Sequence, residues 1–152
     1  MLIVLAVLIG IVAGLRAFTA PAAVSLAVHY GCLSVLGTPL AFLGYRWTPW
    51  ILLVLALAEL VGDQLPATPS RKVPLQFGTR ILMGALAGAA LAASGGLALG
   101  AIAGAVGAVI GTFGGAAARA KLAAAFRNDR PAALIEDVIA IGGAWLLVCC
   151  LA

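Results

Sequence analysis

Charged side chains are scarce in this chain of 152 residues. Nine Lys or Arg and five Asp or Glu make up 9% of the sequence, while 64% of it is hydrophobic. An ordinary soluble domain carries roughly 25% charged residues, so these few cannot cover the surface of a water-soluble globule of this size. The composition therefore excludes a soluble enzyme, a disordered chain and a free nucleic-acid-binding protein. It predicts an integral membrane protein built as a helix bundle.

Histidine and cysteine are also rare. The chain has one His and three Cys, and Cys32, Cys149 and Cys150 lie in apolar runs without a CxxC motif or a cluster of histidines. Side chains of neighbouring helix residues point about 100° apart, so a disulfide between Cys149 and Cys150 is not expected. We read the three as small apolar side chains and predict no cofactor and no metal site.

Proline, glycine and polar residues divide the apolar sequence into six segments that approach the roughly 20 residues needed to cross a bilayer. Thr19-Ala20-Pro21 favours a break followed by a new helix, and Gly37-Thr38-Pro39 favours a stop. Trp47 and Trp50 are typical interfacial anchors. The predicted architecture is an all-α, polytopic transmembrane helix bundle with spans at residues 2–18, 21–36, 49–63, 80–93, 97–118 and 131–151.

Most basic residues lie in two stretches, one after the third span and one after the fifth. Loops on the cytoplasmic side of membrane proteins carry an excess of Lys and Arg. Six spans place the loop 64–79 and the turn 119–130 in the cytoplasm, and the turn 94–96 and both termini on the other side. The basic residues concerned are Arg71, Lys72, Arg80, Arg119, Lys121, Arg127 and Arg130.

The second segment leaves an alternative open. If residues 21–36 re-enter the membrane instead of crossing it, five spans remain and the N-terminus is cytoplasmic. With six spans, the single transmembrane domain 1–152 divides into halves 1–63 and 80–152, joined by the cytoplasmic loop 64–79. Residues 56–61 resemble residues 133–138. This similarity favours an inverted repeat, as in many transporters, with chance similarity between two alanine-rich segments as the alternative.

Glycines recur every three or four residues along the fifth predicted span and in the fourth. Small residues at this spacing let membrane helices approach closely. We expect them to pack helices within one chain, and the seam of a homo-oligomer is the alternative. The residues are Gly84, Gly88, Gly100, Gly104, Gly107, Gly111 and Gly115.

Six charged side chains fall within the spans or at their ends. A buried charge costs at least ~2.5–3.5 kcal/mol on insertion scales, so such residues tend to pair or to line water. They are Arg16, Glu59, Asp63, Arg80, Glu136 and Asp137, and we expect them to converge on the cytoplasmic half of the bundle. Candidate pairs are Arg16 with Glu59, and Arg80 with Asp63 or Glu136. The network would line a polar path for solute, or it would be a set of ion pairs that fixes helix register.

The loop after Asp63 is the second unusual feature. Two prolines fix its path, while Thr68, Ser70, Arg71 and Lys72 would together hold an anion or a lipid head group. A stiff cytoplasmic connector is the alternative.

Four sequence segments taken together resemble a known family. They are Gly14-Leu15-Arg16-Ala17-Phe18-Thr19-Ala20-Pro21, the run from Glu59 through Asp63 to Arg71, Gly111-Thr112-Phe113-Gly114-Gly115, and Glu136-Asp137. The chain resembles a family of small bacterial integral membrane proteins classified as a domain of unknown function. The resemblance covers nearly the whole chain and implies a multi-pass protein of the bacterial inner membrane. It implies no activity, substrate or catalytic residue.

We predict a small transporter or channel that moves protons, ions or a small polar solute past the charged side chains. One alternative is a membrane structural or assembly factor that docks a partner through its glycine-lined face and basic loops. Another is an enzyme acting on a lipid phosphate, with Glu59 and Asp63, four residues apart, as acid–base groups or magnesium ligands. The expected partners are the lipid bilayer, the solute and, for a homo-oligomer, a second copy of the chain; no nucleic acid is expected.

Overall fold

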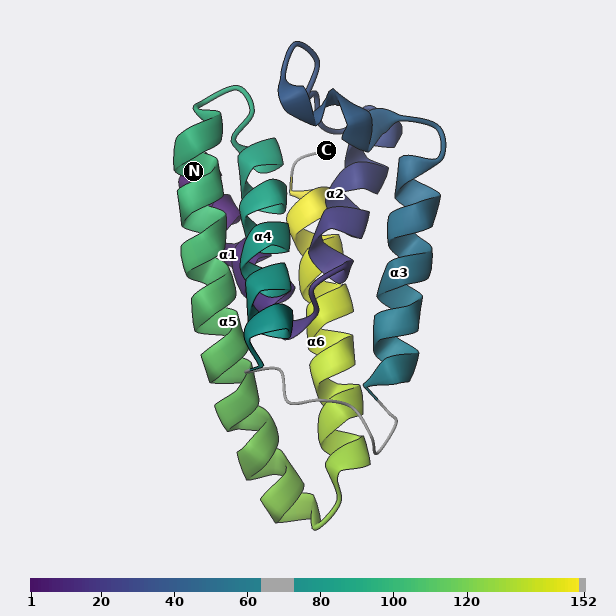
Figure 1. Ribbon diagram of the computed structural model, residues 1–152, viewed down its shortest axis with the longest axis vertical. Coiled ribbons are helices and arrows are strands. Elements are labelled where there is room, and N and C mark those ends of the chain that lie inside the picture. Colours follow the sequence, from purple (N-terminus) through teal and green to yellow (C-terminus); the bar gives the residue numbers. More distant parts are fainter. Residues whose placement is uncertain (64–72, 151–152) are drawn as a thin grey trace.

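The computed structural model describes residues 1–63 and 73–150. These residues form six α-helices and one 3-10 helix, without a strand, which confirms the all-helical class. The helices are α1 (Leu2–Leu15), α2 (Thr19–His29), η1 (Pro39–Gly44), α3 (Thr48–Gly62), α4 (Pro74–Leu91), α5 (Leu97–Phe126) and α6 (Asp129–Cys149). The α-helices stand side by side in one bundle, with the N-terminus and the end of α6 near one end of it and the α5–α6 turn at the other (Figure 1).

Local sequence signals account for several helix ends. Pro49 and Pro74 occupy the first turns of α3 and α4, where the missing backbone N–H costs nothing. Arg127 has a φ of 52°, a left-handed conformation that ends α5. The side-chain oxygen of Asn128 then accepts a hydrogen bond of 3.1 Å from the Arg130 backbone N–H and caps α6.

Three helices extend further than the apolar segments predicted. α4 begins at Pro74, so Arg80 lies within the helix and does not open it. α5 continues past Ala118 to Phe126, and α6 already begins at Asp129. The predicted turn 119–130 is therefore helical over most of its length. Hydropathy marks where side chains stop being apolar, whereas the backbone remains helical through good helix formers such as Ala, Lys and Arg.

Two of the helices, α5 with 30 residues and α6 with 21, are long and apolar enough to cross a membrane. α1 and α3 are apolar but have only 14 and 15 residues. α2 is shorter still, with 11 residues. At 1.5 Å per residue α2 is about 16 Å long, roughly half the thickness of a hydrocarbon core.

The glycines bring α5 close to α4 and to α1. A Cβ atom added to Gly104 would lie 2.1 Å from the Gly84 carbonyl oxygen, and one added to Gly88 would lie 2.4 Å from that of Gly100. On the side of α1, a Cβ on Gly107 would lie 2.1 Å from the Val7 carbonyl oxygen. A Cβ on Gly111 would likewise lie 2.2 Å from the Ile11 carbonyl oxygen. These six glycines therefore pack helices of one chain, as predicted for Gly84, Gly88, Gly100, Gly104, Gly107 and Gly111.

Aromatic side chains gather at the end of the bundle that carries the N-terminus. Tyr30, Tyr45, Trp47 and Trp50 lie in the α2–α3 connection and the first turn of α3, and all four are exposed. Trp145 is exposed near the end of α6, which approaches the same end of the molecule (Figure 1). These five residues are all the Trp and Tyr of the chain.

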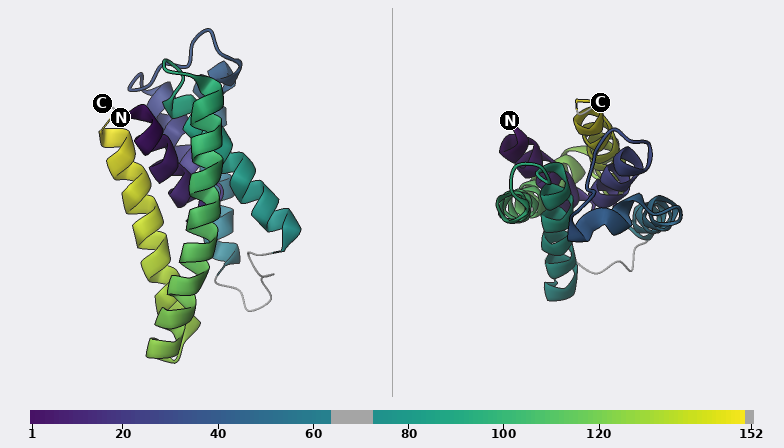
Figure 2. Two further views of the ribbon diagram at one scale, coloured as in Figure 1. Left: turned by 90° about the vertical axis from the view of Figure 1, so that its left-hand side faces the viewer. Right: turned by 90° about the horizontal axis from the view of Figure 1, so that it is seen from above.

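Helix α3 stands at one edge of the bundle. Seen from above, it lies beyond α2, on the side away from α1 and α5 (Figure 2). Its backbone packs against α2 and η1, whereas α1, α4 and α5 pack closely against one another. Glu59 and Asp63, at the C-terminal end of α3, therefore decide how α3 contacts the helices beyond α2 and η1.

Candidate functional site

A break between the first two helices forms the centre of the site. α1 ends at Leu15, Arg16 has an extended backbone with φ −140° and ψ 112°, and α2 begins at Thr19. The sequence predicted a break here, although the new helix begins two residues before Pro21. The last carbonyl groups of α1 and the first N–H groups of α2 have no partners within their own helices and need them from elsewhere.

Arg80 supplies partners for the last carbonyl groups of α1, and Glu59 supplies them for the two backbone N–H groups just before α2. The Arg80 Nη1 donates hydrogen bonds of 2.6 Å to the carbonyl oxygens of Gly14 and Leu15, at the end of α1. The Glu59 carboxylate accepts hydrogen bonds from the backbone N–H of Ala17 at 2.8 Å and of Phe18 at 3.0 Å. A cation thus caps the negative end of one helix dipole and an anion the positive end of the other.

Arg16 itself points to the other side of the break. Its guanidinium donates to the carboxylates of Asp63, at the end of α3, and Asp137, in α6. The Arg16 side chain is completely buried. A buried charge is stabilised only when it is paired and hydrogen-bonded, and here one arginine joins two helices to the α1–α2 break.

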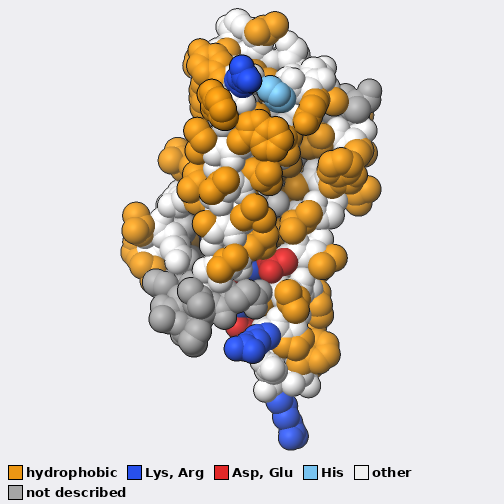
Figure 3. Space-filling view, turned by 90° about the vertical axis from the view of Figure 1, so that its right-hand side faces the viewer, with side chains coloured by type: hydrophobic (Ala, Val, Ile, Leu, Met, Phe, Trp, Pro, Cys, Tyr) orange, Lys and Arg blue, Asp and Glu red, His pale blue; other side chains and the backbone are white. Residues whose placement is uncertain are grey.

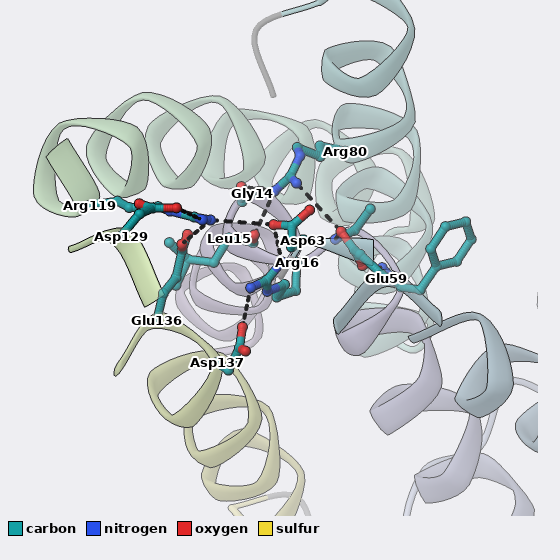
Figure 4. Close-up of polar contacts among 12 residues, drawn as sticks. Gly14, Leu15, Arg16, Glu59, Asp63, Arg80, Arg119, Asp129, Glu136 and Asp137 are labelled. Carbon is teal, nitrogen blue, oxygen red and sulfur yellow. Dashed lines mark hydrogen bonds and ion pairs between the residues drawn. The ribbon is translucent and has the colours of Figure 1, made fainter. Parts of the chain in front are cut away.

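Arg119 extends the network along α5. Its Nε donates a hydrogen bond of 2.9 Å to Asp129, at the start of α6. Its Nη1 lies 3.5 Å from an Asp63 oxygen and 3.7 Å from a Glu136 oxygen. Asp63 is therefore shared between Arg16 and Arg119, and the two arginines form one connected network (Figure 4).

The structure brings together all six charged residues singled out in the sequence, but not in the expected pairs. Arg16 pairs with Asp63 and Asp137, not with Glu59. The partner found for Arg80 is Glu59, with 3.5 Å between Nη2 and Oε1. Arg119 and Asp129 also belong to the network, and sequence reasoning assigned both to a cytoplasmic turn. All five acidic residues of the chain thus meet in one network: Glu59, Asp63, Asp129, Glu136 and Asp137.

Two polar atoms at the break lack a hydrogen-bond partner among the described residues. They are Arg16 Nε and Thr19 Oγ1, and both are buried. Buried polar groups in proteins nearly always have a partner, so these two are candidate contacts for water or a bound solute. Thr19 was not among the site residues predicted from the sequence, although it lies in the predicted break and in the segment Gly14–Pro21 of the family resemblance.

Glu59 and Asp63 serve different partners, although they lie one turn apart on α3. Glu59 caps α2, and Asp63 pairs with Arg16 and Arg119. Within residues 1–63 and 73–150, no three His, Cys, Asp or Glu side chains are placed to hold a metal ion. This arrangement gives no support to a magnesium site at Glu59 and Asp63.

The predicted anion site at Thr68, Ser70, Arg71 and Lys72 lies outside the described residues.

The remaining segment of the family resemblance, Gly111–Gly115, also lies at the break. Thr112 Oγ1 donates a hydrogen bond of 2.8 Å to the Ala108 carbonyl and lies 3.3 Å from the Gly14 carbonyl oxygen. Phe113 packs edge-on against Phe77 of α4, with 5.6 Å between ring centroids. The described parts of the four segments that resembled a family in the sequence, with residues 64–71 left aside, thus lie in one region of the fold.

Comparison with known proteins identifies the family. The family model described as "Domain of unknown function (DUF4126)" matches residues 3–150. This chain is a DUF4126 protein. The match confirms the resemblance predicted from the sequence motifs. No curated protein and no solved structure matches the DUF4126 chain.

A groove lies beside the network, between α5 and α6. Its volume is about 240 Å³, and its exposed lining is almost entirely apolar. Gly115, the last of the predicted packing glycines, lines this groove. On the face of the molecule shown in Figure 3, acidic side chains reach the surface between hydrophobic side chains above and Lys and Arg side chains below.

Proposed function

We propose that this DUF4126 protein is a multi-pass protein of the bacterial inner membrane that moves a proton, an ion or a small polar solute through the charge network. The observation that carries the proposal is the helix break at Arg16, where buried or half-buried charged side chains from α3, α4 and α6 meet. Transporters commonly build their sites from discontinuous helices whose ends face the transported species.

We infer that the chain crosses the membrane six times. The side chain of Leu2 lies beside the turn after α4, since its Cδ1 would be 3.3 Å from a Cβ on Gly95. The N-terminus and this uncharged turn therefore lie at the same end of the bundle, which supports the inference of six crossings. The exposed Trp and Tyr side chains belong at the outer interface, and Lys121, Arg127 and Arg130 belong in the cytoplasm.

The network has the chemistry that a transport site needs. Arg16 is held by two carboxylates from different helices, so a cation or proton that binds one carboxylate competes with the guanidinium for it. The unpartnered Arg16 Nε and Thr19 Oγ1 are available to water or to a polar solute at the same place. α3 packs against α2 and η1, and its contacts with the α1–α2 break, with Arg80 of α4 and with Arg119 of α5 run through Glu59 and Asp63, so a change in these contacts is coupled to movement of α3.

Flux into proteoliposomes tests the proposal. Vesicles containing wild-type protein would be compared with protein-free vesicles for protons, monovalent ions and small metabolites, and then with vesicles containing Asp63→Asn. Arg46→Gln is the matched control, because Arg46 is exposed at the opposite end of the bundle. We expect flux of at least one species, its loss in Asp63→Asn and its retention in Arg46→Gln. Absence of flux for every species tested would overturn the proposal.

A structural or assembly role is the second candidate, and one observation favours it. Glu59 and Arg80 form hydrogen bonds with the backbone at the break as well as an ion pair with each other. Such contacts are expected of residues that hold the break in one fixed conformation. Under this alternative, Asp63→Asn lowers the melting temperature while wild-type vesicles show no flux.

A further inference from the structure

The apolar groove between α5 and α6 ends at the charge network. Gly114, Ala118 and Leu122 form its α5 wall, and Ile135 and Ile139 form its α6 wall. The α5 wall extends over nine residues, about 12 Å along the helix axis. Leu15, at the end of α1, also lines the groove, and so do Arg119 and Glu136 of the network. The exposed surface of the lining is nevertheless almost entirely apolar, so such a groove on a membrane protein accepts hydrocarbon readily.

One end of the groove is basic. Leu122 lies near the end of α5, so the groove extends toward the α5–α6 turn. Lys121, Arg127 and Arg130 are exposed in or beside that turn. The acidic residue there, Asp129, is already bonded to Arg119. The exposed charge next to the groove is therefore predominantly positive.

From this juxtaposition we propose that the groove binds one acyl chain of an anionic phospholipid, whose phosphate contacts the basic residues of the α5–α6 turn. Basic surfaces at the cytoplasmic side of transmembrane helices attract anionic lipids, and each CH₂ group buried adds about 0.8 kcal/mol in lipid anchoring. The inference rests on the membrane location proposed above but does not depend on transport. Failure to detect flux would leave it standing.

Two glycines provide a matched pair of variants. Gly114 lines the groove, and a Cβ added to it would meet nothing within 4 Å, so Gly114→Leu places a side chain in the groove without a backbone clash. Gly142 in α6 is equally open but does not line the groove. Gly142→Leu therefore controls for the added apolar surface and the higher helix propensity of leucine.

The experiment measures lipid binding to purified protein in detergent by native mass spectrometry, with phosphatidylglycerol and phosphatidylcholine of the same acyl composition. We expect the wild type to prefer phosphatidylglycerol. Gly114→Leu is expected to weaken binding about tenfold or more, because exclusion of two methylene groups is worth that factor. Gly142→Leu is expected to bind as the wild type does.

A second variant tests the head group. Replacement of Lys121, Arg127 and Arg130 by Gln should abolish the preference for phosphatidylglycerol while binding of phosphatidylcholine is unchanged. Equal binding of the two lipids by the wild type would overturn the assignment of an anionic head group. Equal binding of phosphatidylglycerol by Gly114→Leu and Gly142→Leu would overturn the assignment of the groove. Both results are independent of the flux assay.

Discussion

Arg80 and Glu59 face each other across the break between α1 and α2, with 3.5 Å between the arginine Nη2 and the glutamate Oε1. Each also caps one of the two helix ends that meet there. The pair comes from α4 and α3, so the interrupted backbone is stabilised by two helices that are distant from it in sequence. The helix break is therefore a product of tertiary contacts as well as of Pro21.

Replacement of Glu59 tests whether the helix break depends on these contacts. Glu59→Ala leaves the N–H groups of Ala17 and Phe18 without the carboxylate and removes the partner of Arg80. Loss of partners for buried donors costs about 1–3 kcal/mol each, so we expect a loss of about 2–4 kcal/mol in the free energy of unfolding. Glu59→Gln keeps one acceptor oxygen and should lose about half as much. Denaturant titration in mixed micelles measures both, and equal losses would contradict the capping role.

The close contact between α4 and α5 predicts that a larger side chain at Gly104 lowers the stability of the protein. Gly104→Ala would bring a methyl group to 2.1 Å from the Gly84 carbonyl oxygen, so the two helices must separate. Overpacking of this kind typically costs 1–3 kcal/mol. Gly114→Ala is the control, because a Cβ there meets nothing within 4 Å. We expect Gly104→Ala to lower the melting temperature and Gly114→Ala to leave it unchanged or raise it.

The acidic residues of the network should contribute to the free energy of unfolding according to how deeply each is buried. Asp129 has a side chain that is 60% exposed, and an exposed ion pair contributes about 0–1 kcal/mol. Asp137 is buried beside Arg16, and removal of one partner from a buried pair costs about 3–5 kcal/mol. The same change, Asp to Asn, should therefore be nearly neutral at position 129 and strongly destabilising at 137. Similar melting temperatures for the two variants would contradict this.

Topology can be tested with single cysteines in a background that lacks the native three. Six crossings place Leu2→Cys and a Cys32 restored as the single cysteine outside, and Lys121→Cys inside. A membrane-impermeant maleimide should therefore label the first two in intact cells and Lys121→Cys only after permeabilisation. Labelling of Leu2→Cys only after permeabilisation would support the five-span alternative, in which the N-terminus is cytoplasmic.

The sequence predicted the helical class, the break near Pro21 and the meeting of six charged residues. These features follow from local signals: hydropathy, a proline and the cost of an isolated charge in an apolar segment. The pairs could not be predicted, because they depend on how each helix is rotated about its axis. Glu59 was expected to meet Arg16, but it caps the backbone next to Arg16 instead.

Arg119 and Asp129 were missed for a related reason. Both lie beyond the apolar part of their helices, and a hydropathy pattern assigns such residues to a loop. In the structure α5 continues for two further turns, so Arg119 is a helical residue whose side chain reaches Glu136 and Asp63. Arg119 and Asp129 are ten residues apart on either side of a tight helical hairpin, and this spacing could have predicted their pairing from the sequence. The proposed inverted repeat stays a prediction.

The account depends most on the buried contact between Arg16 and Asp137, and a double-mutant cycle tests it directly. The free energy of unfolding would be measured for the wild type, Arg16→Gln, Asp137→Asn and the double variant. We predict that the double variant loses less stability than the two single losses added together, by about 1–3 kcal/mol, because each single variant leaves a buried charge without one of its partners. Additive losses would show that Arg16 and Asp137 act independently, and would contradict the account.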